Sequence, residues 1–481
     1  MPTAAGAAGA VGMGASPDST IGGRRGGGPC RTAARLLLGG VRLPAGTYAS
    51  AKSTVGFHLG PPLADPRRIA QAACDRVSGH TVGIVRDCRA VADPLLAGWS
   101  MHVARGPRRL VGWHLSYALD GTGVSTDPNA SRVAAVAEVV EGYCGTAPLR
   151  DDIRYRASPR QLGSRAVAWQ HLAWPSADQY GRLSTLRAMT DDHAIDWCPA
   201  WSLTRGRVML VPAAFVIADV TNDVLPEWTS TGLASHVCLT RAVLGGLCEV
   251  LERDALATTW YNALATTPLS PAGTPLERLL DRLDREAGVT VRLMVLPTDS
   301  PFPVVLALAR RHVAPPFAAV GVACHANLAM AASKAVAESI QVMVRLKPGG
   351  DGSDLDDDPA ARYATPEGAE LLESCLQPTE ETVGHCTEPS LRSPSVALNA
   401  GVAQLARQGL EVLAAELTTA DVAQAGWRVV RVMVPGTVWP GTRPEMAPLG
   451  ARRLYRLPVD LGLRSTPLSE HELRSLPVPL S

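Results

Sequence analysis

The sequence predicts a mixed α/β or α+β chain, and three observations favour this class. Apolar runs rich in β-branched residues indicate strands, among them "VTVRLMVLP" (289–297), "PVVLALARR" (303–311) and "WRVVRVMVPG" (427–436). Stretches rich in alanine and leucine lie between these runs and have the spacing of helices. At 481 residues the chain is also long enough to bury a large core. Alternation of the two kinds of segment is typical of chains in which helices cover sheets.

The domain boundaries follow from shifts in composition. Residues 1–64 have a Gly/Ala-rich start and are predicted to be disordered, so the folded region begins near Asp65. The segment 348–395 contains "PGGDGSDLDDDP" and is predicted to be an acidic, flexible surface insertion, with a partner-facing role as the alternative. The region 65–481 is then divided into an N-terminal part, core motifs, this insertion and a C-terminal part with a proline-rich end (65–225, 226–347, 348–395 and 396–481).

Charge and cysteine content narrow the class of partner. A net charge of +1 and a pI of about 7.6 do not suggest binding to nucleic acid or to an acidic membrane. The ten cysteines include no C-x-x-C pair, which favours free thiols in a reducing cytoplasm over disulfides or a zinc site. No run approaches the roughly 18 apolar residues that a membrane span needs. We expect a soluble, cytoplasmic protein without nucleic-acid or membrane partners.

An internal repeat is the most informative feature of the sequence. "GLASHVCLTRAVLGGLCEVLE" (232–252) aligns without a gap with "GVACHANLAMAASKAVAESIQ" (321–341). A looser third copy is "TGVSTDPNASRVAAVAEVVEGY" (122–143). The chain therefore contains three loop–helix units, each with an acidic or amide pair spaced i, i+3 on an apolar helix: Glu138 and Glu141, Glu249 and Glu252, Glu338 and Gln341.

These pairs predict a magnesium site. Most Glu-x-x-Glu pairs lie on solvated helix faces, but "VAAVAEVV" has almost no other polar residue, and three helices share the format. A buried carboxylate costs several kcal/mol unless it is paired, and Arg253 can neutralise only one or two of them. Mg²⁺ accepts carboxylate and amide oxygens and usually brings substrate phosphates. Six converging side chains would make such a cage.

Other motifs that would indicate a known chemistry are missing. The sequence has no Walker A motif, and no G-x-G-x-x-G follows a predicted strand, so a nucleotide would be held through metal ions and arginine. His236 and His325 could contact a ligand, although an ordinary role at the start of a helix is the favoured interpretation. No Ser/His/Asp or Cys/His arrangement indicates covalent catalysis.

At these residues the sequence resembles the YcaO family of ATP-dependent enzymes that activate backbone amides of ribosomally made peptides. The matching segments are "STGLASH" (230–236), "EVLERDA" (249–255) and "CHANLAMAASKAVAESIQ" (324–341). The end "LPVPLS" is similar to the Pro-x-Pro-x-Pro terminus of the azoline-forming branch (D-protein type), as in thiazole/oxazole-modified or thiopeptide-like pathways. The resemblance implies a YcaO-like fold with repeated loop–helix units around a central nucleotide site.

The resemblance implies a cyclodehydratase that uses ATP and Mg²⁺ to convert Cys, Ser or Thr of a precursor peptide into thiazoline or oxazoline. It assigns metal binding to Glu138, Glu141, Glu249 and Glu252, and nucleotide binding to Ser230, Arg253, Glu338 and Gln341. It assigns a catalytic role to the tail residues Pro477, Pro479 and Ser481.

The same resemblance implies partners and leaves alternatives open. The sequence shows no E1-like region before residue 65, so we expect a separate E1-like (ThiF-like) leader-peptide-binding protein; a homodimer is also open. The family usually has lysine, serine and arginine in the first motif, and an Asn and a Glu in the second, where this chain has Thr122, Ala134, Gly142, Val237 and Arg241. A degenerate scaffold subunit and a thioamide-forming enzyme are the alternatives.

Overall fold

The computed structural model describes residues 66–481 apart from fourteen short gaps. These are residues 82, 108, 111–112, 115–118, 147–154, 184–185, 219, 221–222, 225–227, 315, 348–358, 380–392, 442–445 and 481. The predicted disorder of residues 1–64 therefore lies outside the described residues.

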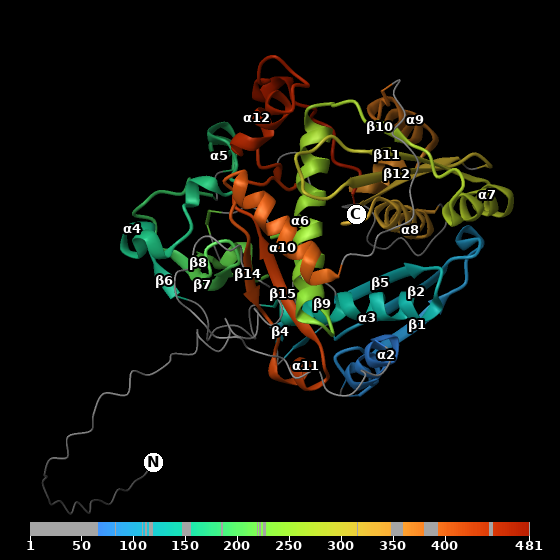
Figure 1. Ribbon diagram of the computed structural model, residues 1–481, viewed down its shortest axis with the longest axis horizontal. Helices are drawn as coiled ribbons and strands as arrows, with labels where there is room; N and C mark the ends of the chain where they lie inside the picture. Colours follow the sequence, from blue (N-terminus) through green and yellow to red (C-terminus); the bar gives the residue numbers. More distant parts are fainter. Residues whose placement is uncertain are drawn as a thin grey trace, which may run out of the picture.

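Every pairing among the described strands is antiparallel, and the strands form four sheets (Figure 1). The largest has the order β6 (Tyr155–Ala157), β7 (Ile195–Ser202), β14 (Leu413–Glu416), β15 (Arg428–Met433) and β9 (Leu233–His236), with β8 (Arg207–Pro212) paired to β7. The second contains β10 (Thr267–Leu269), β11 (Val289–Val295), β12 (Val304–Arg311) and β13 (Phe317–Cys324). The third contains β1 (Asp87–Val91), β2 (Ser100–Arg105) and β5 (Asp120–Ser125), and a small hairpin pairs β3 (Arg109–Leu110) with β4 (Trp113–His114).

Helices pack on these sheets, and the long central helix α6 lies between them (Figure 1). α3 packs on β5 and β2, α8 on β13 and β12, and α6 on β15 and β9. The bounds are α2 Pro66–Val77, α3 Pro128–Cys144, α4 Pro159–Leu162, α5 Ala177–Arg182, α6 Leu239–Tyr261, α7 Pro275–Ala287, α8 Leu328–Leu346, α9 Pro366–Cys375, α10 Pro394–Arg407, α11 Ala420–Gln424 and α12 Arg452–Asp460. In the described part of the chain, no helix has both the length and the hydropathy to cross a bilayer.

The predicted fold class is confirmed, and most predicted strands lie where the apolar runs are. The apolar segment "RVMLVPAAFVIADV" (207–220) is a strand only at its start, because β8 ends at Pro212 and a 3₁₀ turn follows over Ala213–Phe215. Proline has no N–H to continue a ladder, which explains the early end.

Part of the predicted flexible insertion packs against the core instead. Residues 359–379 include α9, and Leu372 and Tyr363 are fully buried there. The hydroxyl of Tyr363 donates to the carbonyl of Pro477 at 2.7 Å, which ties this segment to the end of the chain. The acidic run at 351–358 made the composition of the whole segment polar, so the composition did not indicate the apolar face of the helix that follows. The rest of the insertion, 348–358 and 380–392, lies outside the described residues.

Candidate functional site

Each predicted loop–helix unit is a strand followed by a helix: β5–α3, β9–α6 and β13–α8. Glycine allows the first and third helices to lie close to their strands. A Cβ on Gly121 would lie 2.1 Å from the carbonyl oxygen of Ala135, and a Cβ on Gly321 would lie 2.2 Å from that of Ala335. Any side chain at these two positions would push the helix, and its carboxylates, away from the strand.

The two repeat histidines order the loops that precede their helices. Nδ1 of His236 accepts from the backbone N–H of Cys238 at 2.8 Å, and Nδ1 of His325 accepts from that of Asn327 at 3.1 Å. Burial lowers the pKa of both imidazoles, to about 4 for His236. Both histidines thus take part in the loop before a helix, as the favoured interpretation expects, and a contact with a ligand stays untested.

The first acidic residue of each unit binds the backbone of its own strand. Oε2 of Glu138 accepts from the N–H of Thr122 at 2.8 Å, and Oε2 of Glu338 accepts from that of Val322 at 2.8 Å. Glu249 accepts from the backbone of Gly232, which directly precedes β9. Each strand therefore fixes one carboxylate of the helix that follows it.

The second acidic residue reaches the next unit. Oε1 of Glu141 on α3 accepts from the N–H of Ser235 on β9 at 2.7 Å, and Oε2 of Glu252 on α6 accepts from that of Cys324 on β13 at 3.2 Å. Gln341 holds the corresponding place on α8, where it is half-buried, and α8 packs against β5 of the first unit. These two hydrogen bonds and the packing of α8 on β5 arrange the three units in a cycle.

The crowded carboxylates raise one another's pKa. Burial, and then the neighbouring Glu249 and Glu338, raise the pKa of Glu138 to about 7, although this side chain keeps an exposed surface. Burial is also the main cause that raises the pKa of Glu141 and Glu252 well above the usual range.

Arg253 is the cation in contact with these groups. Its Nε lies 3.3 Å from Oε1 of Glu252, without hydrogen-bond geometry, and its Nη2 lies 4.0 Å from Oε1 of Glu249. Arg253 pairs directly with two of the five carboxylates, and Arg431, Arg345 and Lys334 act on the group from further away, so the carboxylates still outnumber the nearby cations when all are ionised.

This donor set suits Mg²⁺ with a nucleotide. Within the described ranges, no three His, Cys, Asp or Glu side chains are close enough to hold a metal ion by themselves. Four of the carboxylates are instead engaged by backbone N–H groups. The predicted cage of six converging side chains is therefore not formed by these side chains alone. Mg²⁺ typically keeps waters and takes phosphate oxygens beside one or two carboxylates, so hard oxygen donors spaced this way fit it. Assignment of the four metal ligands stays a prediction.

The predicted nucleotide residue Ser230 is exposed in the loop before β9, and β15 holds that loop. The carbonyl of Gly232 accepts from the N–H of Val432 at 2.7 Å. Gly232 has φ +84°, and a Cβ there would lie 2.1 Å from the carbonyl oxygen of Val432, so only glycine fits. Nη2 of Arg431 donates to the carbonyl of Thr229 at 2.6 Å. Sequence reasoning missed Arg431, although a lone arginine within "VVRVMV" was a signal.

A second missed group is a buried ionic network next to Arg253. Asp254 is 1% exposed and accepts from the Nε of Arg453 at 3.0 Å and its Nη2 at 2.9 Å. Arg453 also pairs with Asp299, and Oδ1 of Asp254 accepts from the N–H of Val438 at 2.8 Å. The network fixes α12 and the loop after β15 to the acidic helix α6.

The proline-rich tail packs beside α6. Nε1 of Trp260 donates to the carbonyl of Leu476 at 2.9 Å, and Val478 is 1% exposed. Figure 1 shows the red C-terminal segment running down to the middle of α6. Pro477 and Pro479 therefore belong to an ordered tail, whereas Ser481 lies outside the described residues. The catalytic role of all three stays a prediction.

Comparison with known proteins agrees with this geometry. A sequence profile described as YcaO cyclodehydratase, ATP- and Mg²⁺-binding, matches residues 122–438. An uncharacterized protein in the tfuA 3′ region of Rhizobium leguminosarum bv. trifolii is 32% identical over 162 residues, which are 31% of this chain and 38% of that protein. The uncharacterized protein Rv1375 of Mycobacterium tuberculosis is 28% identical over 348 residues, 68% of this chain and 73% of that protein.

Solved structures share the fold. A heterocyclase in complex with substrate and cofactor has a TM-score of 0.72 at 23% identity and covers 87% of this chain, which spans 57% of that protein. YcaO from Methanopyrus kandleri, bound with AMPPCP and Mg²⁺, has a TM-score of 0.60 at 23% identity, with 78% and 91% of the two chains covered. The E. coli microcin synthetase McbBCD complex gives 0.55 at 15% identity, with 73% and 88% covered. This chain belongs to the YcaO family of ATP- and Mg²⁺-binding cyclodehydratases.

Proposed function

We propose that the protein converts Cys, or Ser and Thr, of a ribosomally made precursor peptide into thiazoline or oxazoline. The observation that carries this proposal is the cycle of three strand–helix units, which brings five carboxylates together around one paired arginine. No three of these carboxylates are close enough to hold a metal ion by themselves, but each offers hard oxygen donors to a Mg²⁺ ion that arrives with phosphate, and the family to which the chain belongs binds ATP and Mg²⁺.

The chemistry joins ring formation to phosphate release. The side-chain thiol or hydroxyl adds to the preceding amide carbon, and the former carbonyl oxygen takes the γ-phosphate of ATP. That oxygen then leaves with the phosphate as the C=N bond of the azoline forms, so the peptide loses one water and ATP becomes ADP and phosphate. Mg²⁺ would neutralise charge on the transferred phosphoryl group.

The proposed residue roles follow position. Glu138, Glu141, Glu249 and Glu252 would hold Mg²⁺, and Ser230, Arg253, Glu338 and Gln341 would bind the nucleotide. Arg253 is suited to stabilising charge that develops in transfer, because it already lies between two carboxylates.

We also propose that the tail directs Ser481 toward these groups. Trp260, which holds Leu476, lies eight residues beyond Glu252, or about 12 Å along the helix. A fully extended five-residue segment spans at most about 15 Å, and the N–H of Leu480 donates to the carbonyl of Val478 at 2.8 Å, so the tail turns just before its end. Two prolines limit the number of conformations that the segment can adopt.

An E1-like leader-peptide-binding protein is the proposed partner, and the cytoplasm is the proposed compartment. The multi-protein organisation of the similar McbBCD complex supports the partner. The cysteines within the described ranges form no disulfide, as expected for the proposed reducing compartment.

One reconstitution tests the function. The protein is mixed with candidate precursor, the leader-binding partner and Mg-ATP, and the mass of the peptide is measured by mass spectrometry. Loss of one water per ring, with phosphate release, supports the proposal. In a second reaction with sulfide added as the sulfur donor, exchange of an oxygen for a sulfur would indicate the thioamide-forming reaction. Binding of peptide and partner without ATP turnover would indicate a scaffold.

A further inference from the structure

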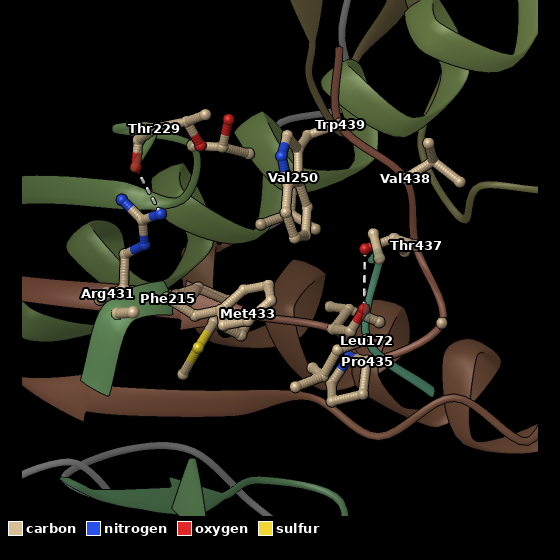
Figure 2. A pocket seen from close by; sticks show the side chains of 16 residues that line it. Leu172, Phe215, Thr229, Val250, Arg431, Met433, Pro435, Thr437, Val438 and Trp439 are labelled. Atoms are coloured by element: carbon tan, nitrogen blue, oxygen red, sulfur yellow. Dashed lines mark hydrogen bonds between the residues drawn. The ribbon is translucent and has the colours of Figure 1, made fainter. Parts of the chain in front are cut away.

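A narrow pocket lies beside α6, between β15 and the chain that follows it (Figure 2). Aromatic and aliphatic side chains form most of its wall, and three threonines add hydroxyl groups. Its water-sized space is about 40 Å³, room for on the order of three waters. Residues that matter below are Ala214, Phe215, Val250, Arg431 and Trp439.

Arg431 lines the pocket, and its buried guanidinium has N–H donors without an acceptor in the described part of the chain. It is 4% exposed, and its Nε and Nη1 have no acceptor among the described residues, while Nη2 is held by Thr229. The guanidinium carbon lies 5.4 Å from the ring centre of Trp228. Burial lowers its pKa to about 10, so it stays protonated at neutral pH. Two N–H groups of a buried cation are costly unless a ligand accepts from them.

The ligand that suits this site has a neutral acceptor and an apolar part. Glu249 already opposes the charge of Arg431, so the idle donors require a carbonyl oxygen rather than a second anion. Phe215 and Trp439 meet edge to face at 5.2 Å and form an aromatic wall. A peptide residue supplies both features, because its carbonyl and its side chain leave the same backbone.

The position of the pocket connects it to the reaction. Val250 in its wall directly follows Glu249, and Thr229 and Thr231 flank Ser230 of the proposed nucleotide loop. We propose that the pocket binds the precursor residue that adjoins the residue being cyclised, with its carbonyl on Arg431 and its side chain against Phe215 and Trp439. This inference rests on the proposed function and adds a determinant of peptide specificity to it.

Changes in pocket size test the inference. Trp439→Ala widens the pocket, and Ala214→Leu narrows it from another part of the wall. Precursors that differ only in the adjoining residue, alanine or tryptophan, are compared with the partner and Mg-ATP present. We compare kcat/KM for the tryptophan precursor with kcat/KM for the alanine precursor. The ratio should rise about tenfold in Trp439→Ala and fall about tenfold in Ala214→Leu, while the KM for ATP stays unchanged. Trp201→Ala, a half-buried tryptophan outside the pocket, is the matched control.

Arg431→Lys tests the carbonyl contact. Lysine keeps a positive charge and one donor for Thr229 but loses the planar fork of the guanidinium. We expect the KM for peptide to rise about tenfold while the KM for ATP stays constant. Thermal unfolding of each variant verifies that it is folded.

Each other outcome is decisive. A rise in the KM for ATP alone would assign the pocket to the nucleotide and overturn the inference, as would unchanged peptide preference in both size variants. If the wild-type protein forms no azoline, binding of fluorescent precursor is measured instead. If the affinity for the precursors changes with the size of the pocket, the pocket is supported while the proposed function fails. If the affinity does not change, both are rejected.

Discussion

Replacement of Glu252 by glutamine should make the ligand-free protein more stable and the enzyme inactive. Glu252 is 9% exposed, and its pKa is raised well above the usual range by burial and then by Glu338. Glutamine keeps the shape of the side chain, and its carbonyl can still accept from the N–H of Cys324. The substitution therefore removes a charge without opening a cavity.

The sign and size of the stability change follow from the raised pKa. When the pKa of a carboxyl is higher in the folded than in the unfolded protein, the protein becomes less stable as the pH rises between the two values. At neutral pH the ionisation of Glu252 therefore opposes folding. An unpaired buried carboxylate costs several kcal/mol, and the contact with Arg253 offsets part of this. We expect a gain of about 1–2 kcal/mol in the free energy of unfolding. For roughly 400 folded residues this raises the Tm by about 1–2 °C.

Two assays on the same preparation check the prediction. Thermal unfolding is measured at neutral pH without nucleotide, and phosphate release is measured with peptide, partner and Mg-ATP. Loss of one magnesium ligand should lower turnover about 100-fold or more. The control is Glu286→Gln, because Glu286 is half-exposed in a surface pair with Arg282 and should change neither quantity. Turnover at the wild-type rate, or a clearly lower Tm, would refute the reasoning.

Further predictions concern pH, the buried network and the tail. Because the pKa of Glu138 is raised to about 7 and Mg²⁺ needs the ionised form, the affinity for Mg-nucleotide should fall between about pH 8 and pH 6, with proton release on binding; calorimetry that shows neither would contradict this. Asp254→Asn removes one of the two carboxylates that pair with Arg453 and leaves Asp299, so it should lower the free energy of unfolding by about 1–3 kcal/mol, measured in denaturant; an unchanged or higher free energy of unfolding would count against the network. Deletion of residues 477–481 should reduce azoline formation far more than ATP binding, and equal losses would indicate a structural role alone.

The sequence predicted the three units and their acidic pairs because each unit is local. The strand, the helix and the i, i+3 pair lie within about 25 residues, and repetition separates the pattern from chance. Which strand receives the second carboxylate could not be predicted, since Glu141 binds Ser235 and Glu252 binds Cys324 across long stretches of chain. That choice depends on the packing of the units against one another.

Buried charges with distant partners were missed for the same reason. Arg453 lies 199 residues from Asp254, and neither residue stands out in its own segment. Arg431 interrupts a valine-rich strand, but only the pairing of β15 with β9 places it at the loop that contains Ser230. Sequence patterns therefore located the helices of the site better than the side chains that hold its loops.

This chain departs from the family pattern at positions whose side chains do not hold the acidic residues, because backbone N–H groups hold them instead. Thr122 holds Glu138 through its backbone N–H, so the residue type at 122 can change while that hydrogen bond remains. Ala134 is exposed, and Arg241 is exposed near the start of α6. Ser235, Cys324 and Val322 likewise act through backbone N–H groups. If the proposed nucleotide site is correct, the five departures leave these backbone hydrogen bonds intact and change only the side chains near the nucleotide. The KM for ATP should therefore depart further from that of other family members than the affinity for Mg²⁺ does.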